Sequence, residues 1–135
     1  IGENPENAVS IGGPSSGVLP HNQLHIKIMP GRIHETGIML GAGGLVVLKD
    51  KTNVLQFIKN LAKYNADESC GKCTPCREGT PRIVNMLEKL KPSTDTAAYR
   101  EELSDLAEVV SSASLCGLGQ GAGTPIKSFL HFWPD

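Results

Sequence analysis

The sequence predicts an α+β fold in which a small β-rich unit precedes a helical bundle. Two observations indicate this order. The first 50 residues are rich in glycine and contain apolar residues at alternate positions, whereas from residue 51 the apolar residues recur every three or four positions. A chain of 135 residues with 39% hydrophobic residues can bury a core in one ordinary domain or two small ones. We therefore divide it into residues 1–50 and 51–135.

Two strands and two bends are expected in the first unit. Leu24, Ile26 and Ile28 take alternate positions in residues 24–29, as in a half-buried strand that ends at Pro30. A second strand is expected at residues 45–48, which are all leucine or valine. The glycine-rich segments at residues 12–17 and 41–44 mark tight bends.

Four amphipathic helices are expected in the second unit. Asp50 or Thr52 can cap the first, and the second and fourth begin at Thr80-Pro81 and Thr124-Pro125, because proline suits the first helical position. The third spans roughly residues 95–112. The residues expected on the inward faces are listed here from the first helix to the fourth: Val54, Leu55, Ile58, Leu61 and Ala62; Ile83, Val84, Leu87 and Leu90; Tyr99, Leu103, Leu106 and Val110; and Ile126, Phe129, Leu130 and Trp133. Short helices cannot bury such faces alone, so a bundle is expected.

The charge pattern argues against several classes of partner. The net charge is −1, with 13 basic and 14 acidic residues and no long run of one sign, so nucleic acid and anionic membranes are poor partners. The apolar stretches are too short for membrane insertion, and no signal pattern opens the chain. We expect a cytoplasmic protein, or one peripheral to the cytoplasmic side of a membrane complex. Since the chain opens on Ile1 and a polar stretch, we expect a fragment or a processed chain.

The four cysteines carry the strongest chemical signal. Cys70, Cys73 and Cys76 form a C-x2-C-x2-C motif, and 39 residues separate Cys76 from Cys116. A compact loop can direct three thiolates to three irons of a cubane while a distant segment supplies the fourth ligand. The two helices predicted between Cys76 and Cys116 would return the chain to the same end of the bundle. The spacing therefore predicts one [4Fe–4S] cluster on these four cysteines.

Other uses of four cysteines are weaker predictions. A structural zinc site commonly pairs two C-x2-C knuckles or adds histidine, and none of His21, His25, His34 and His131 has knuckle spacing. A redox dithiol needs a βαβ setting, and a two-cluster ferredoxin needs more cysteines. Disulfides are disfavoured because three cysteines lie within seven residues of a chain without a signal pattern. A docking module, stabilised by zinc or metal-free, is the alternative.

Residues near the cysteines could adjust such a cluster. The glycines after Cys116 would let the backbone approach closely and aim N–H groups at sulfur. Lys72 and Arg77 flank the first loop, where cations raise the reduction potential of an anionic cluster; solvated surface side chains are the alternative. The remaining candidates are interpreted as capping, surface or core residues, so no catalytic residue is predicted: Glu35, Glu68, Glu78, His131 and Trp133.

Residues 68–79, Glu68-Ser69-Cys70-Gly71-Lys72-Cys73-Thr74-Pro75-Cys76-Arg77-Glu78-Gly79, resemble a known iron–sulfur motif. This motif occurs in the NADH-binding flavoprotein subunit of complex I (NADH dehydrogenase). It also occurs in homologous diaphorase subunits of NAD-reducing or electron-bifurcating hydrogenases and of NAD-dependent formate dehydrogenases. Residues 116–120 and 124–126 are similar to the fourth-ligand loop of that family. Residues 41–47 resemble the end of its β-grasp domain. The resemblance covers nearly the whole chain.

The resemblance implies that separate domains bind the separate cofactors. In that family an N-terminal domain binds FMN and NADH, a ubiquitin-like β-grasp domain of the soluble-ligand-binding type follows, and a helical domain carries the cluster. Residues 1–50 would be the β-grasp domain and residues 51–135 the helical one. The chain would be an electron-transfer module that relays single electrons from flavin to iron–sulfur partner subunits. FMN and NAD(H) would bind only to a missing N-terminal domain, so the chain alone is not expected to catalyse.

Overall fold

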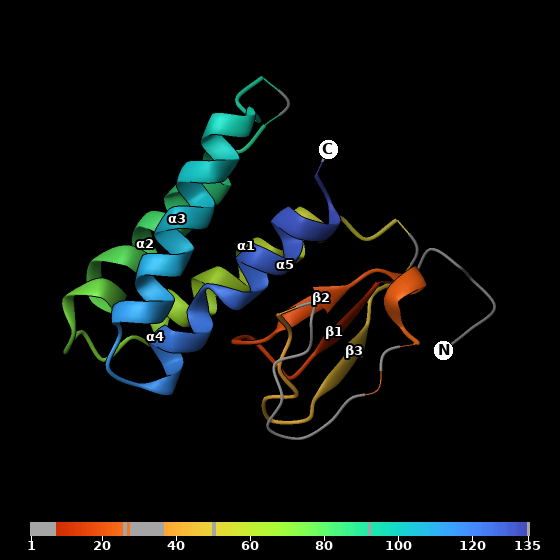
Figure 1. The fold of residues 1–135 in the computed structure, drawn as a ribbon, viewed down its shortest axis with the longest axis horizontal. Coiled ribbons are helices and arrows are strands. Elements are labelled where there is room, and N and C mark those ends of the chain that lie inside the picture. The colour runs from red at the N-terminus through yellow and green to blue at the C-terminus, as the bar shows by residue number, and fades with distance from the viewer. Residues whose placement is uncertain (1–7, 26, 28–36, 50, 92, 135) are drawn as a thin grey trace.

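The computed structural model describes residues 8–25, 27, 37–49, 51–91 and 93–134. A small sheet occupies one end of the molecule and the helices occupy the rest (Figure 1). Helices α1 (Val54–Asp67) and α5 (Thr124–Phe132) lie between this sheet and the paired helices α2 (Thr74–Lys89) and α3 (Ala97–Ala113). Short helix α4 (Gly117–Ala122) lies near the start of α2. The arrangement confirms an α+β fold with the strands first.

The sheet has three antiparallel strands in the order β2-β1-β3. These are β1 (Val9–Ile11), β2 (Gly17–Leu19) and β3 (Leu45–Val47). Ser10 of β1 is opposite Val18 of β2 on one side and Val46 of β3 on the other. The β1–β2 turn and the bend before β3 were both predicted, as was β3 itself. Gly12 has φ +85°, and a Cβ there would lie 2.6 Å from the carbonyl oxygens of Met39 and Leu40, so only glycine fits.

The strand predicted at residues 24–29 is wrong at its start. A short 3₁₀ helix, η1 (His21–Gln23), follows Pro20, and the Leu24 N–H donates to the His21 carbonyl oxygen at 3.1 Å. Leu24 and His25 therefore lie in a turn, because this local hydrogen bond outweighs their apolar–polar alternation. Most of the remaining residues of that prediction lie outside the described part of the chain.

Two predicted helix starts are also wrong. The cap of α1 is Asn53, whose side chain accepts the Gln56 N–H at 3.0 Å, rather than Asp50 or Thr52. Helix α2 begins at Thr74, six residues before the predicted start at Thr80. Pro75 takes the first turn of α2, and Pro81 lies inside the helix, where it removes the backbone donor to the carbonyl of Arg77.

The remaining helices follow the prediction except for one addition. Helix α3 begins after Thr96, whose side chain accepts the Tyr99 N–H at 3.2 Å, and α5 begins at the predicted Thr124. Helix α4, directly after Cys116, was not predicted. The described residues thus form five α-helices rather than four.

One hydrophobic core spans the sheet and the helices. Ala8, Val18 and Leu48 from the strand-bearing unit join buried residues of the helices in it. The helical members include Ile58, Ile83, Leu87, Leu103, Val110 and Ile126. A smaller core on the other face of the sheet contains Val9, Ile11, Leu19 and Ile38. The larger core therefore joins one face of the sheet to the helices, and Phe132 of α5 packs against the smaller core.

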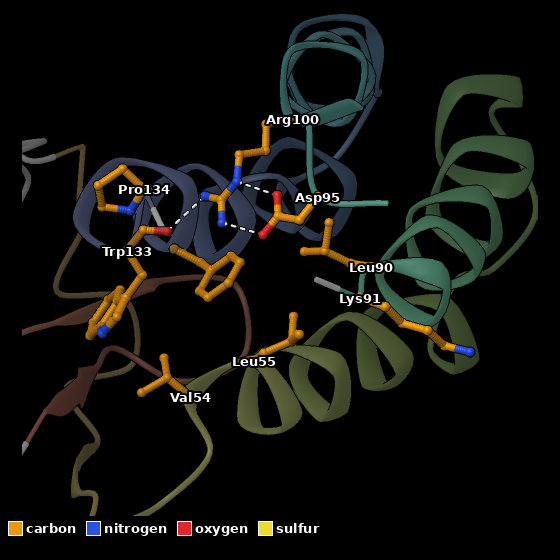
Figure 2. A pocket seen from close by; sticks show the side chains of 9 residues that line it. Val54, Leu55, Leu90, Lys91, Asp95, Arg100, Trp133 and Pro134 are labelled. Atoms are coloured by element: carbon orange, nitrogen blue, oxygen red, sulfur yellow. Dashed lines mark hydrogen bonds and ion pairs between the residues drawn. The ribbon is translucent and has the colours of Figure 1, made fainter. Parts of the chain in front are cut away.

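The ends of the helices remote from the cysteines surround a pocket of about 550 Å³ (Figure 2). Arg100 of α3 donates to both carboxylate oxygens of Asp95, at 2.5 and 2.7 Å, and to the carbonyl oxygen of Trp133 at 2.7 Å. The guanidinium also lies 5.8 Å from the centre of the Phe129 ring. These contacts fasten the end of α5 to the start of α3. Hydrogen bonds from Arg100 hold the pKa of Asp95 below its ordinary value.

The Asp95–Arg100 pair should make stability depend on pH. A carboxyl whose pKa is lowered by folding stabilises the protein above its unfolded value, here 3.8, and this contribution is lost as the pH falls through the folded value. We expect Asp95→Asn to reduce the free energy of unfolding at pH 7 by about 1–2 kcal/mol. Denaturant unfolding of both proteins between pH 7 and 2.5 measures the difference, which should shrink below about pH 4.

The exposed Asp105, on the same helix, supplies the control for this prediction. Asp105→Asn should unfold at nearly the wild-type denaturant concentration at pH 7. A destabilisation by Asp95→Asn that stays constant down to pH 2.5 would contradict the assignment, because an unpaired or neutral Asp95 would give no pH dependence.

Candidate metal centre

Three of the four cysteines lie in and just after the loop that joins α1 to α2. Cys70 is exposed in the loop, and Gly71 after it has φ +73°, a left-handed conformation that favours glycine. Cys73 is the N-cap residue of α2, with extended backbone angles and no side-chain cap. Cys76 is buried in the first turn of α2, with 5% of its surface exposed. The three thiols are thus presented from a tight turn and a helix start.

Two side chains hold this loop together. Arg77 donates to the Gly71 carbonyl oxygen at 2.9 Å and to Thr74 Oγ1 at 3.4 Å, and it pairs with Glu78 at 2.9 Å. Ser69 Oγ accepts the Gly71 N–H at 3.4 Å and lies 3.2 Å from Cys76 Sγ. The sequence singled out Arg77 only as a nearby cation and missed Ser69.

The structure brings the segment that carries Cys116 against this loop. The backbone N–H of Leu115 lies close enough to the Cys73 thiol to lower its pKa. Gly119 of α4 packs so closely on the start of α2 that a Cβ there would lie 3.2 Å from the Cβ of Cys76. Cys116 is exposed, as is Leu115, and is the N-cap residue of α4. Both cysteine segments therefore lie at the same end of the helices.

The surroundings change the acidity of the Cys73 thiol. Nearby backbone N–H groups, first that of Leu115 and then that of Cys76, lower the pKa of Cys73, and burial opposes them. Ser114 lies close enough to act in the same direction, although its buried hydroxyl makes no hydrogen bond of normal geometry with the described residues. A lowered pKa favours the thiolate, which is the form that binds metal.

The donor set fits an iron–sulfur cluster better than a single ion. All four cysteines carry free thiols, and thiolates are the usual ligands of [4Fe–4S] clusters. A zinc ion needs all of its thiolates about 2.3 Å from one point. Among the described residues, no three histidine, cysteine, aspartate or glutamate side chains are grouped closely enough to hold one ion.

Comparison with known proteins decides the family. The family model of the NADH-ubiquinone oxidoreductase-F iron-sulfur binding region matches residues 56–135, more than half of the chain. The chain belongs to this family. Proteins of this family bind a [4Fe–4S] cluster, which confirms the predicted resemblance and the predicted cluster type. The family match also confirms the prediction of an iron–sulfur domain of NADH-linked oxidoreductase subunits.

Relatives match nearly all of the chain. The NADP-reducing hydrogenase subunit HndC of Solidesulfovibrio fructosivorans is 36% identical over 121 residues, which are 90% of this chain and 25% of the relative. A subunit of the NADH-quinone oxidoreductase of Streptomyces coelicolor is 33% identical over 124 residues, 92% of this chain and 28% of the relative. The chain therefore spans about a quarter of the length of these relatives.

A solved structure has the same fold. The NAD+-reducing [NiFe]-hydrogenase in its H2-reduced state superposes with a TM-score of 0.79 at 27% identity, over 98% of this chain and 22% of that chain. The relatives in both comparisons belong to oxidoreductases of several subunits. Within the described residues, no helix has the length and apolar character needed to cross a membrane.

Removing the distant cysteine tests the ligand set. We expect Cys116→Ala to leave a three-ligand site that loses iron or converts to a smaller cluster. Its rate of iron loss to a chelator should rise by more than the roughly 10–100-fold that the loss of an outer hydrogen-bond partner costs. Iron release and electron paramagnetic resonance measure the change, with Ser112→Ala, an exposed site at the end of α3, as control. A full and equally stable cluster in Cys116→Ala would exclude Cys116 as a ligand.

The Ser69 hydroxyl should raise the reduction potential of a bound cluster. Once Cys76 is a thiolate, Ser69 is the donor across their 3.2 Å contact, and such hydrogen bonds favour the reduced, more negative cluster. We expect Ser69→Ala to lower the potential in a redox titration followed by electron paramagnetic resonance. Ser69→Thr, which keeps the hydroxyl, should stay close to wild type. Equal potentials in all three proteins would show that Ser69 makes no such bond.

Proposed function

We propose that Cys70, Cys73, Cys76 and Cys116 hold one [4Fe–4S] cluster, and that the chain is the electron-transfer module of an NADH-linked oxidoreductase. The observation that carries the proposal is the packing of Gly119, three residues after Cys116, on Cys76: a Cβ at Gly119 would lie 3.2 Å from the Cβ of Cys76, which joins the two cysteine segments at one end of the helices. The chain belongs to a family of iron–sulfur-binding regions, and this membership supports the assignment of the four thiols. The bound cluster would accept and donate one electron at a time.

The chain's own residues would prepare the site for this chemistry. The N–H of Leu115 favours the thiolate at Cys73, the hydroxyl of Ser69 lies within hydrogen-bond distance of the Cys76 sulfur, and Arg77 holds the loop in shape. Cys76 is buried and sheltered from water, whereas Cys70 and Cys116 face outward. Solvent exposure and hydrogen bonds to sulfur are the main protein contributions to the potential of a cluster.

The domain division is part of the proposal. Residues 1–50 would form a β-grasp domain and residues 51–135 a helical bundle, supported by a three-stranded sheet that precedes the helices and by the family match from residue 56. FMN and NAD(H) would bind to an N-terminal domain, since the relatives are about four times as long as the matched region. NADH oxidation is then expected of the whole protein rather than of these residues alone.

Partner subunits would receive the electrons. An iron–sulfur protein is the proposed acceptor, because relatives are subunits of hydrogenases and NADH-quinone oxidoreductases. The cysteine end offers a surface for such contact: Cys70 and Cys116 are exposed, and Leu115 between the two segments is 76% exposed. We place the protein in the cytoplasm or on the cytoplasmic side of a membrane complex, without nucleic acid as a partner.

Metal and sulfide analysis of the anaerobically prepared chain tests the proposal. We expect about four irons and four acid-labile sulfides per chain, broad visible absorption, and a paramagnetic signal on reduction, because four thiolates complete a cubane. Loss of the visible absorption in Cys73→Ala would tie it to this site. Zinc without iron or sulfide would overturn the proposal and favour the docking module instead.

A further inference from the structure

Helix α4 lies tightly between the cysteine loop and the sheet. Gly119 and Gly121 are two residues apart, about 200° around a helix, so they face opposite sides of α4. On one side, a Cβ at Gly119 would lie 3.2 Å from the Cβ of Cys76. On the other, a Cβ at Gly121 would lie 2.7 Å from the Cβ of Ser15 and 2.9 Å from its carbonyl oxygen. The β1–β2 turn therefore contacts the helix that follows Cys116.

Asn65 fastens this turn to the end of α1. Its side-chain amide donates to the Pro14 carbonyl oxygen at 2.8 Å, and its side-chain oxygen accepts from Ser15 Oγ at 3.1 Å. The residue is 1% exposed, so both ends of a buried amide are satisfied by the same turn. Asn65 also lies five residues before Cys70. One side chain thus links the segment that leads to the first cysteine with the turn that contacts α4.

The strand after the turn is fixed as well. The Val18 N–H donates to Ser128 Oγ at 3.1 Å, and this hydroxyl donates to the Pro125 carbonyl oxygen at 2.9 Å. At Gly17 a Cβ would lie 3.1 Å from Ser128 Oγ and would also overlap Ile38, so β2 is packed directly on α5. The turn is therefore held from both α1 and α5 and has little freedom to move away from α4.

Helix α4 needs such support. It has six residues, of which three are glycines that disfavour a helix because they lose the most backbone freedom on folding: Gly117, Gly119 and Gly121. Isolated helices of this length are unstable in water. The position of α4, and of Cys116 at its start, must come from its neighbours.

We infer that the turn of Pro14–Ser16 is a brace that holds α4, and with it Cys116, against the other three cysteines, and that Asn65 is its positioning residue. The inference rests on the proposed function for its consequence, a stable four-ligand site. In this inference, the turn of the small sheet helps to hold that site together. Loss of the brace should loosen Cys116 while leaving Cys70, Cys73 and Cys76 in their own loop.

Two variants disrupt the brace, one by a change in α1 and the other by a change in α4. Asn65→Ala deletes both hydrogen bonds to the turn, and Gly121→Ala places a methyl group against Ser15. Asn60→Ala, at an exposed position of α1, and Gly44→Ala, where a Cβ meets nothing within 4 Å, are the matched controls. Ser15→Ala deletes only one hydrogen bond and serves if a stronger variant does not fold.

Hydrogen exchange of the reduced, metal-free chain gives the first readout. We expect amides of residues 114–122 to exchange at least about tenfold faster in Asn65→Ala and Gly121→Ala, with smaller changes in Ser15→Ala and none in residues 101–110 of α3. In the cluster-loaded chain, the same variants should lose iron about tenfold faster and show the signal of a three-iron cluster. The controls should match wild type in both measurements.

Two results would overturn the inference. One is wild-type exchange at residues 114–122 in both strong variants. The other is a uniform increase across α1, α2, α3 and α5, which would indicate general destabilisation instead of a local brace. If wild type itself takes up no iron, the proposed function fails, and the exchange comparison still decides whether the brace exists.

Discussion

The close approach of backbones around the cysteines is the constraint on which the rest of this structure depends. Where α2, α3 and α4 meet, the contacts are made at glycines: Gly79 of α2 packs on Val110 of α3, and Gly119 packs on Cys76. At Gly123 a Cβ would lie 2.5 Å from the Ala107 carbonyl oxygen. Any side chain at these places would separate the helices and move the two cysteine segments apart.

This constraint explains which elements the sequence could predict. The apolar stripes of α1, α3 and α5 face the common core, so their period is visible in the sequence. Helix α4 shows no such stripe, since it is half glycine and is held by contacts with Ser15, Cys76 and Ser114 that only the folded chain provides. The start of α2 was missed for a related reason. Its first six residues are mostly polar or cysteine, and the chain offers two Thr-Pro pairs there, Thr74-Pro75 and Thr80-Pro81.

The sequence singles out the cysteines proposed as ligands but not the contacts that support them. Cysteine spacing is a property of the sequence, whereas the hydrogen bond of Arg77 to Gly71 requires the left-handed backbone at Gly71. From the sequence, Arg77 could act through its charge or be a solvated surface residue. Its side chain is 47% exposed and paired with Glu78, so solvent and the carboxylate weaken its field at the cysteines. Its three contacts indicate that holding the loop in shape is its larger effect.

The two ends of the helices differ in how tightly their residues are bound and in how exposed they are. At the far end, Arg100 joins Asp95 to the Trp133 carbonyl, which ties α3 to the end of α5 through partly buried charge-assisted bonds. At the cysteine end, an electron carrier must lie near the surface, because a partner has to come close. Because Cys70 and Cys116 are exposed, a cluster on the proposed ligands would lie near that surface. Stability supplied at the far end and by the sheet turn is what lets the cysteine end remain open.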